Sequence, residues 1–268
     1  MHVYTLQRIK PNENKILGLH VDTTTYQDVT KEIMNWAING ENRYVCVANV
    51  HMVMEAYDDA TLRKVVNQAD LVTPDGMPLV WMLRRLGHPL EDRVYGPTLT
   101  LRVLEAAARQ GIPVGFYGGA PDVLVRLVKN VQNRYKNIQI AYRFSPPFRE
   151  LTPEEDKAIV QDIEASQTRI LFVGLGCPKQ EQWMAAHVDR MQTVMLGVGA
   201  AFDFHAGKVR QAPNWLQNKG LEWLYRLLTE PGRLWKRYLR HNPRCEVLGM
   251  MELARIRRRG PVKVARRF

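Results

Sequence analysis

The chain of 268 residues has few cysteines and no long apolar run, and both features narrow what it can be. Cys46, Cys177 and Cys245 are too few and too scattered for a disulfide framework, which favours a reducing compartment. No stretch of about 18 uninterrupted apolar residues is present, and residues 1–15 lack the apolar core of a signal peptide. We therefore expect a cytosolic protein that does not cross a membrane.

The sequence also lacks the common patterns of metal ligands. Its seven histidines show no paired ligand spacing, and no Asp-x-Asp pair is present to hold magnesium against a diphosphate. Cys177 precedes a predicted helix, where a thiolate would be stabilised, but no histidine adjoins it, and a packing role is favoured. We expect neither a metal nor another cofactor.

The formal net charge of +11 is concentrated at one end of the chain. Residues 1–225 carry 25 Lys and Arg and 24 Asp and Glu, whereas residues 226–268 carry 13 Lys and Arg and three acids. After about Pro213 the strand pattern ends, and tryptophans and tyrosines stand among leucines and arginines. We predict an α/β core over residues 1–210 and a helical, polybasic appendage over residues 211–268.

The apolar pattern of the core alternates short β-rich runs with helical segments, and neither an internal repeat nor a low-complexity tract is visible. Predicted strands are Lys15–Val21, Tyr44–Ala48, Asp70–Thr73, Val114–Tyr117, Ile138–Tyr142, Arg169–Val173 and Thr193–Val198. Predicted helices are Tyr26–Asn39, Met52–Gln68, Met77–Leu86, Thr98–Gln110, Pro121–Tyr135, Pro153–Ala165 and Pro178–Arg190. Continuous apolar strands alternating with helices favour a Rossmann-like, mostly parallel sheet flanked by helices.

Asp75 stands where an apolar strand breaks into a turn, between Pro74 and Gly76. Ligands bind at the carboxyl ends of parallel strands, so an acid at this position is a candidate catalytic carboxylate. Pro74 fixes one backbone angle and Gly76 permits positive φ, and such a turn can aim a side chain out of the sheet. The alternative is that Asp75 only caps the helix beginning near Met77.

Three further strand ends are rich in small residues. Gly118 and Gly119 suit the approach of a phosphate or ribose to bare backbone, although glycines also serve simply to make a tight turn. Asp203 follows the last strand and can accept hydrogen bonds from a ribose or a base, or can cap a short helix or turn.

The third such turn, at Gly174-Leu175-Gly176, leads to Lys179, Gln180 and Glu181 in the first turn of a helix. An anionic ligand would offset the unfavourable lysine there. Because the third glycine of the GxGxxG pattern is replaced by Lys179, a nicotinamide-dependent oxidoreductase is disfavoured.

Taken together, these segments resemble a known family. The chain is similar to the WecG/TagA/CpsF glycosyltransferases over about residues 15–240, with motifs in the same order: Asn49 in Val47–His51, Asp75-Gly76, Arg93 before Gly96, Gly118-Gly119, Pro178–Glu181, Gly197–Gly199 and Leu221–Arg226. The resemblance implies an inverting, metal-independent transfer of a sugar from a UDP-sugar. The sugar implied is N-acetylmannosamine, with glucose or N-acetylmannosaminuronate as alternatives. The acceptor implied is a GlcNAc-type sugar on a polyprenyl diphosphate lipid, at the cytoplasmic membrane face, in the synthesis of an envelope polymer.

The resemblance also assigns roles to residues. Asp75 matches the general base, and Arg93 matches an arginine that neutralises the departing diphosphate. Asn49 and Gln180 match positions that contact the sugar or the nucleotide. Asp203 matches an acid near the uridine. One departure concerns Val47, where some members have threonine. The missing hydroxyl leaves the donor sugar open.

The polybasic appendage then has a physical role. Basic residues near anionic lipid contribute on the order of 1 kcal/mol each, which favours peripheral attachment to a membrane surface. Arg226, Arg233 and Arg237 match arginines that reach the lipid diphosphate in the family. A nucleic-acid-binding protein is the alternative from another class, but it assigns no purpose to Asp75 or to the neutral core. Homo-oligomerisation stays open.

Overall fold

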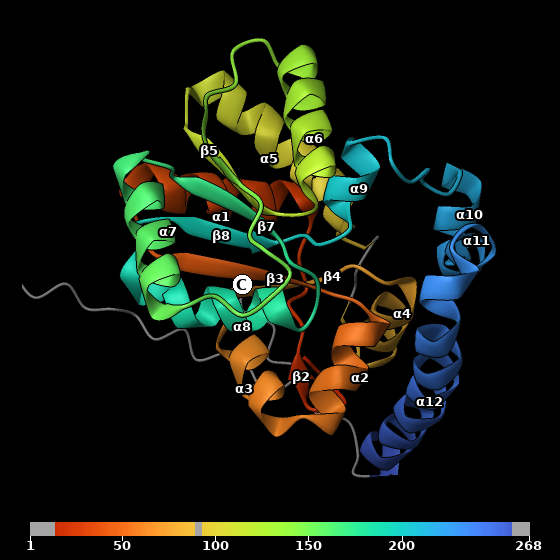
Figure 1. Ribbon diagram of the computed structural model, residues 1–268. Coiled ribbons are helices and arrows are strands. Elements are labelled where there is room, and N and C mark those ends of the chain that lie inside the picture. The colour runs from red at the N-terminus through yellow and green to blue at the C-terminus, as the bar shows by residue number, and fades with distance from the viewer. Residues whose placement is uncertain (1–13, 89–92, 259–268) are drawn as a thin grey trace, which may run out of the picture.

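A computed structural model describes residues 14–88 and 93–258, and its centre is a six-stranded sheet (Figure 1). Its strands are β3 (Arg43–Ala48), β4 (Leu71–Pro74), β5 (Val114–Gly118), β6 (Ile140–Phe144), β7 (Ile170–Gly174) and β8 (Val194–Gly197). They lie in the order β4-β3-β8-β7-β5-β6, and every neighbouring pair is parallel. The predicted Rossmann-like parallel sheet is confirmed.

Helices cover both faces of the sheet, and each face has its own apolar cluster. One face packs against α1 (Tyr26–Asn39), α5 (Gly96–Gln110), α6 (Pro121–Arg134) and α9 (Ala201–His205). The other packs against α2 (Val50–Asp58), α3 (Ala60–Gln68), α4 (Met77–Arg85), α7 (Pro153–Ala165) and α8 (Lys179–His187), which the short 3-10 helix Val188–Arg190 follows.

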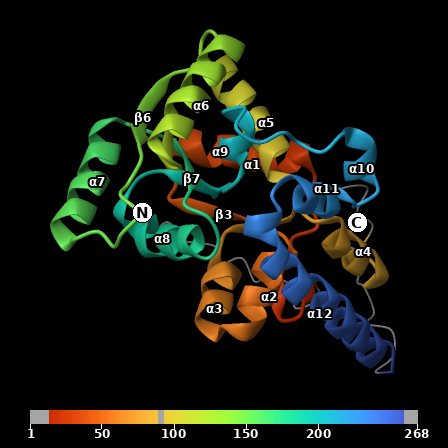
Figure 2. The same ribbon diagram turned by 45° about the vertical axis from the view of Figure 1, so that its right-hand side comes forward.

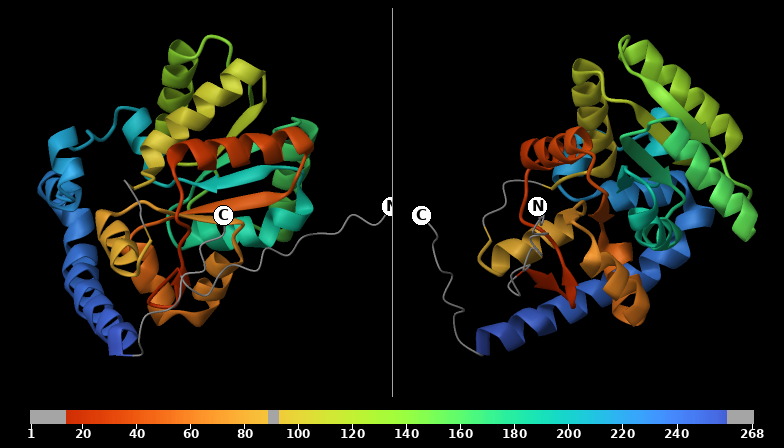
Figure 3. Two further views of the ribbon diagram at one scale, coloured as in Figure 1. Left: turned by 180° about the vertical axis from the view of Figure 1, so that it is seen from behind. Right: turned by 90° about the vertical axis from the view of Figure 1, so that its left-hand side faces the viewer.

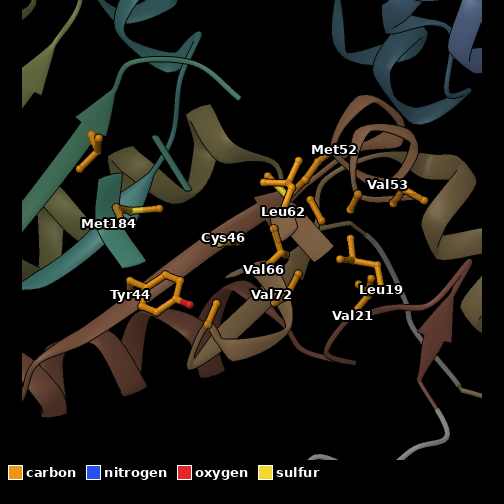
Figure 4. Packing of buried hydrophobic residues seen from close by; sticks show 14 of the residues in the cluster. Leu19, Val21, Tyr44, Cys46, Met52, Val53, Leu62, Val66, Val72 and Met184 are labelled. Atoms are coloured by element: carbon orange, nitrogen blue, oxygen red, sulfur yellow. The ribbon is translucent and has the colours of Figure 1, made fainter. Parts of the chain in front are cut away.

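Figure 4 shows part of this second cluster, where side chains of β3 and β4 meet those of the covering helices. Cys46 of β3 and Val72 of β4 pack with Leu62 and Val66 of α3 and with Met184 of α8, and all five are buried. Strands enclosed in this way explain why the predicted strands read as continuous apolar runs.

Two predicted elements are wrong in detail. Residues 15–21 do not form one strand: β1 (Lys15–Ile16) and β2 (Leu19–His20) pair as an antiparallel hairpin outside the main sheet. Leu17 and Gly18 turn the chain there with φ of 50° and 83°. The helix predicted over residues 52–68 is two helices, because the Asp59 side chain accepts hydrogen bonds from the N–H groups of Thr61 and Leu62 and caps α3.

The last described part of the chain is helical, as predicted, with α10 (Asn214–Asn218), α11 (Glu222–Thr229) and α12 (Pro231–Arg258). α12 runs beside α2 and α4 in all views (Figures 2 and 3). Arg244 donates to both carboxylate oxygens of Asp58 at 2.6 Å, and Glu252 accepts the N–H of Leu17 at 2.8 Å. The boundary near residue 210 stays a prediction, and residues 259–268 of the predicted appendage lie outside the described residues.

Candidate active site

The predicted strand ends meet at one edge of the sheet, at a cavity of about 980 Å³ that we call the sheet-edge pocket. Because the strands are parallel, the loops after β3, β4, β5, β7 and β8 all emerge at this edge. The predicted site residues that line the pocket are Asn49, Asp75, Gly119, Lys179, Gln180, Asp203, Arg226 and Arg237.

A second cavity, of about 490 Å³, lies between α4 and α12, and we call it the α4–α12 pocket. Its apolar walls include Trp81 and Met82 of α4 and Met250 and Leu253 of α12. Six residues line both pockets: Asn49, His51, Asp75, Tyr95, Arg226 and Arg237. The two cavities therefore adjoin along these six residues, Asp75 among them.

The backbone fixes Asp75 at the end of β4. Its N–H donates to the carbonyl of Ala48 on the neighbouring strand at 2.8 Å, and the carbonyl of Pro74 accepts from Val94 at 2.8 Å. Gly76, not Asp75, is the N-cap residue of α4, and no side chain caps that helix. The capping interpretation of Asp75 is therefore wrong, and its side chain is available to the pockets.

The carboxylate of Asp75 has an unusual environment. The backbone N–H of Gly96 donates to it, yet the oxygen Oδ1 is buried without a hydrogen-bond partner among the described residues. Burial raises the pKa of Asp75 to about 7, the charge of Arg93 opposes that rise, and repulsion by Glu222 adds to it. A carboxylate with a pKa near neutrality is a better proton acceptor than an ordinary aspartate and is still partly ionised at neutral pH.

Arg93 lies beside Asp75 in a buried polar network. Its Nη2 atom is 2.8 Å from Glu222 Oε2 and donates to Gln217 Oε1 at 2.9 Å. Its guanidinium lies 4.3 Å from the centre of the Tyr95 ring, and the Tyr95 hydroxyl donates to Glu222 Oε1 at 2.7 Å. The sequence predicts no role for Tyr95, Gln217 or Glu222, although Glu222 falls within the Leu221–Arg226 motif. The folded appendage brings Glu222 and Gln217 to this place.

Asn49 follows β3 and caps α2, because its Oδ1 accepts the N–H of Met52 at 3.1 Å. The same side chain lines both pockets next to Asp75. Val47, where some family members have threonine, lies on the same strand and lines the sheet-edge pocket. A residue at this position therefore faces whatever the pocket binds.

The turn before α8 is held by buried side chains. Gln180 is 4% exposed, its Oε1 accepts the N–H of Gly176 at 3.1 Å, and its Nε2 donates to Glu181 Oε1 at 2.8 Å. Glu181 is fully buried, which raises its pKa, and it does not line the sheet-edge pocket. Lys179 and Gln180 do line the pocket, whereas Glu181 holds the side chain of Gln180 through their hydrogen bond.

Cys177 behaves as a packing residue. Burial, together with the negative charge and hydrogen bond of Glu181, raises the pKa of its thiol far above the ordinary value. A thiol that stays protonated is a poor nucleophile, so the packing interpretation agrees with the structure.

The paired glycines have different surroundings. Gly118 has a φ of 114°, and a Cβ there would lie 2.7 Å from the backbone of Gly174, so close packing of β5 on β7 accounts for this glycine. Gly119 lines the sheet-edge pocket. Asp203 lies within α9 and lines the same pocket, and no side chain caps that helix, so the helix-capping alternative is wrong.

The arginines of the appendage reach the junction of the two pockets. Arg226 of α11 lies 5.3 Å from the centre of the Phe204 ring, and both Arg226 and Arg237 line both pockets. Arg233 lies in α12, but its side chain is outside the described residues. The contact of these arginines with a lipid diphosphate stays a prediction.

Comparison with known proteins agrees with this arrangement. The profile of the glycosyl transferase WecG/TagA/CpsF family matches residues 14–259. A protein of Bacillus spizizenii named N-acetylglucosaminyldiphosphoundecaprenol N-acetyl-beta-D-mannosaminyltransferase is 31% identical over 217 residues, which cover 81% of this chain and 78% of the relative. A Staphylococcus aureus protein of the same name is 31% identical over 225 residues, covering 83% and 85%.

The match extends over all the described residues and so includes every strand of the sheet and the three helices of the appendage. A hexosyltransferase, rather than an oxidoreductase or a nucleic-acid-binding protein, therefore accounts for the pockets and their residues. The chain belongs to the WecG/TagA/CpsF family of glycosyltransferases.

Proposed function

We propose that the chain transfers N-acetylmannosamine from a UDP-sugar to N-acetylglucosamine on a polyprenyl diphosphate lipid, with inversion at the anomeric carbon. The observation that carries the proposal is that the sheet-edge pocket and the more apolar α4–α12 pocket share lining residues that include Asp75. The names of the relatives supply the sugar and the lipid, and their beta-D product is the inverted anomer of an α-linked UDP donor.

The sheet-edge pocket suits the nucleotide sugar. It lies at the carboxyl ends of the strands, where α/β folds bind nucleotides, and Asp203 and Lys179 offer it groups of both charges. Trp183 lines the same cavity and is partly exposed, while the buried Tyr117 stacks on it with ring centroids 4.4 Å apart, so Trp183 offers aromatic surface to a base.

The α4–α12 pocket suits the lipid acceptor. Its apolar side chains match a prenyl chain, and Arg226 and Arg237 stand where the pocket joins Asp75. Guanidinium groups bind phosphate oxygens in pairs, so these two arginines are placed for a diphosphate between lipid and sugar. The acceptor sugar would then lie against Asp75.

In the reaction, the acceptor hydroxyl oxygen bonds to the anomeric carbon while the bond from that carbon to the UDP oxygen breaks. The bonding electrons leave with UDP, and the hydroxyl proton passes to the carboxylate of Asp75, a residue that lines both pockets. In this proposal Arg93, which lines the α4–α12 pocket and not the sheet-edge pocket, stabilises the leaving diphosphate from the junction of the two, so no metal is required. Arg93 is held by Glu222 here, and it would have to leave that ion pair to contact a phosphate directly.

Surface attachment to the inner face of the membrane is part of the proposal. Among the described helices, none is both long and apolar enough to cross a bilayer. α11 and α12 expose large apolar side chains, with Leu228 75%, Trp235 47% and Leu239 65% exposed. Lys236 and Arg240 are exposed among them, a combination that suits the headgroup layer of an anionic membrane.

The test is a panel of UDP-sugars offered with a short-chain prenyl diphosphate N-acetylglucosamine acceptor. We expect UDP-N-acetylmannosamine to give a β-linked disaccharide lipid, identified by mass spectrometry and NMR, and UDP-glucose and UDP-N-acetylmannosaminuronate to react much more slowly. The matched control is an N-acetylglucosamine glycoside without diphosphate. Equal transfer to that control, or no transfer from any UDP-sugar, would contradict the proposal.

A further inference from the structure

Three potential metal ligands from separate parts of the sequence converge between α2 and α12. His51 and Glu55 lie one helical turn apart on α2, and His241 reaches them from α12. Glu55 Oε1 is 3.7 Å from His51 Nδ1 and 3.3 Å from His241 Nε2. One ligand atom from each residue lies within 4.8 Å of the other two, although the histidine spacing in the sequence gives no sign of this.

The ring of His51 is oriented as in a metal ligand. Its Nδ1 is buried without a hydrogen-bond partner, while the ring also bonds to the backbone of Cys177. Because Nδ1 is the unpartnered atom, that bond uses Nε2, which leaves the lone pair on Nδ1, toward Glu55. In metal-bound histidines, a hydrogen bond from the ring nitrogen that does not bind the metal fixes the tautomer in the same way.

His241 approaches the two side chains of α2 from inside the protein. Only 4% of His241 is exposed, and its Nε2 lies 3.3 Å from Glu55 Oε1. The side chain that α12 contributes therefore faces the two that α2 contributes.

We propose that His51 Nδ1, His241 Nε2 and the Glu55 carboxylate bind one divalent transition-metal ion, Zn²⁺ in preference to Mg²⁺. Tetrahedral ligands about 2.0–2.1 Å from zinc lie roughly 3.3 Å from one another, close to two of the separations found here. Two imidazoles and a carboxylate suit zinc better than magnesium, which prefers oxygen ligands. The positive charges of Arg237 and Arg240 both act on this cluster and limit its affinity for a cation.

The ion would join the appendage to the core. α12 is already held by the pair of Arg244 with Asp58 and by the bond of Glu252 to Leu17, so the metal adds to an existing contact. Its role in this proposal is to hold α12 beside α2 and not to take part in bond formation, and it does not depend on which sugar is transferred.

The test uses the full chain after treatment with a chelator. Zn²⁺ is titrated in competition with a chromogenic chelator, and Co²⁺ is titrated by absorption spectroscopy. We expect one ion per chain, a tetrahedral cobalt spectrum, and a higher melting temperature with Zn²⁺. His241→Ala and Glu55→Gln should each weaken binding at least tenfold and abolish the rise in melting temperature.

Glu55→Gln keeps the shape of the side chain and guards against a folding defect of the alanine variant. His88→Ala, at a histidine outside the cluster, is the matched control and should bind as the parent does. If the parent chain binds no Zn²⁺, or binds it as weakly as His241→Ala and Glu55→Gln do, the proposal is wrong. An equal loss in His88→Ala would likewise overturn it.

Discussion

Replacing Asp75 by asparagine should make the protein more stable while it removes the proposed base. Burial raises the pKa of this carboxyl from its ordinary value of 3.8 to about 7, so the folded protein resists its ionisation. A rise of about three pKa units corresponds to about 4 kcal/mol at neutral pH, since each unit is about 1.36 kcal/mol. That figure is an upper bound on the stability that the protein can gain when a neutral amide replaces the carboxyl.

We expect a gain of about 2 kcal/mol at pH 8, because relaxation and water penetration soften the cost of a buried charge. For a chain of this size the melting temperature should rise by roughly 5 °C. The sign follows from the raised pKa. The stability that the protonated carboxyl contributes is fully present below pH 3.8 and is lost as the pH rises through about 7.

The assay is urea or thermal unfolding of the parent chain and Asp75→Asn across this pH range. The difference between their free energies of unfolding should be small near pH 4, grow between about pH 4 and pH 7, and then level off. Asp58→Asn is a control of opposite sign: Arg244 holds the pKa of Asp58 below its usual value, so this variant should lose stability at neutral pH. A difference for Asp75→Asn that does not vary with pH, or a loss of stability at pH 8, would refute the reasoning.

Three further predictions concern the reaction and the membrane. The rate constant kcat/KM should fall tenfold per pH unit below about pH 7 and level off above it, because the base must be ionised; an acid limb near pH 4 would contradict this. EDTA should leave transfer within about twofold while lowering the melting temperature, and a strict magnesium requirement would contradict the arginine mechanism. Replacing Lys236 and Arg240 by glutamine should weaken binding to anionic vesicles, measured by sedimentation, roughly 30-fold and leave binding to neutral vesicles unaffected, because each basic residue contributes about 1 kcal/mol.

Local sequence signals predicted the sheet well, because each buried strand is a short apolar run and each helix has its own start and stop. They failed where one residue redirected the chain. Leu17 adopts a positive φ that its residue type does not favour, and it turns a predicted strand into a hairpin. Asp59 caps a new helix inside a region that reads as one continuous helix.

The position of Asp75 could be predicted, because it depends only on a strand end and a turn. Its chemistry could not, because the raised pKa depends on burial and on Glu222, which the appendage brings to Arg93. The cluster of His51 and His241 has the same origin: its members meet only when α12 packs on α2. Contacts between residues far apart in the sequence therefore account for most features of the site that the sequence did not predict.

The most direct test of Asp75 as the base is the transfer rate of Asp75→Asn, measured together with binding of the UDP-sugar to the same variant. Transfer should fall at least about 100-fold, as expected for loss of a general base. Donor binding should change less than about threefold, because the loss is confined to the transition state. Near-normal transfer by Asp75→Asn with normal donor binding would contradict the assignment.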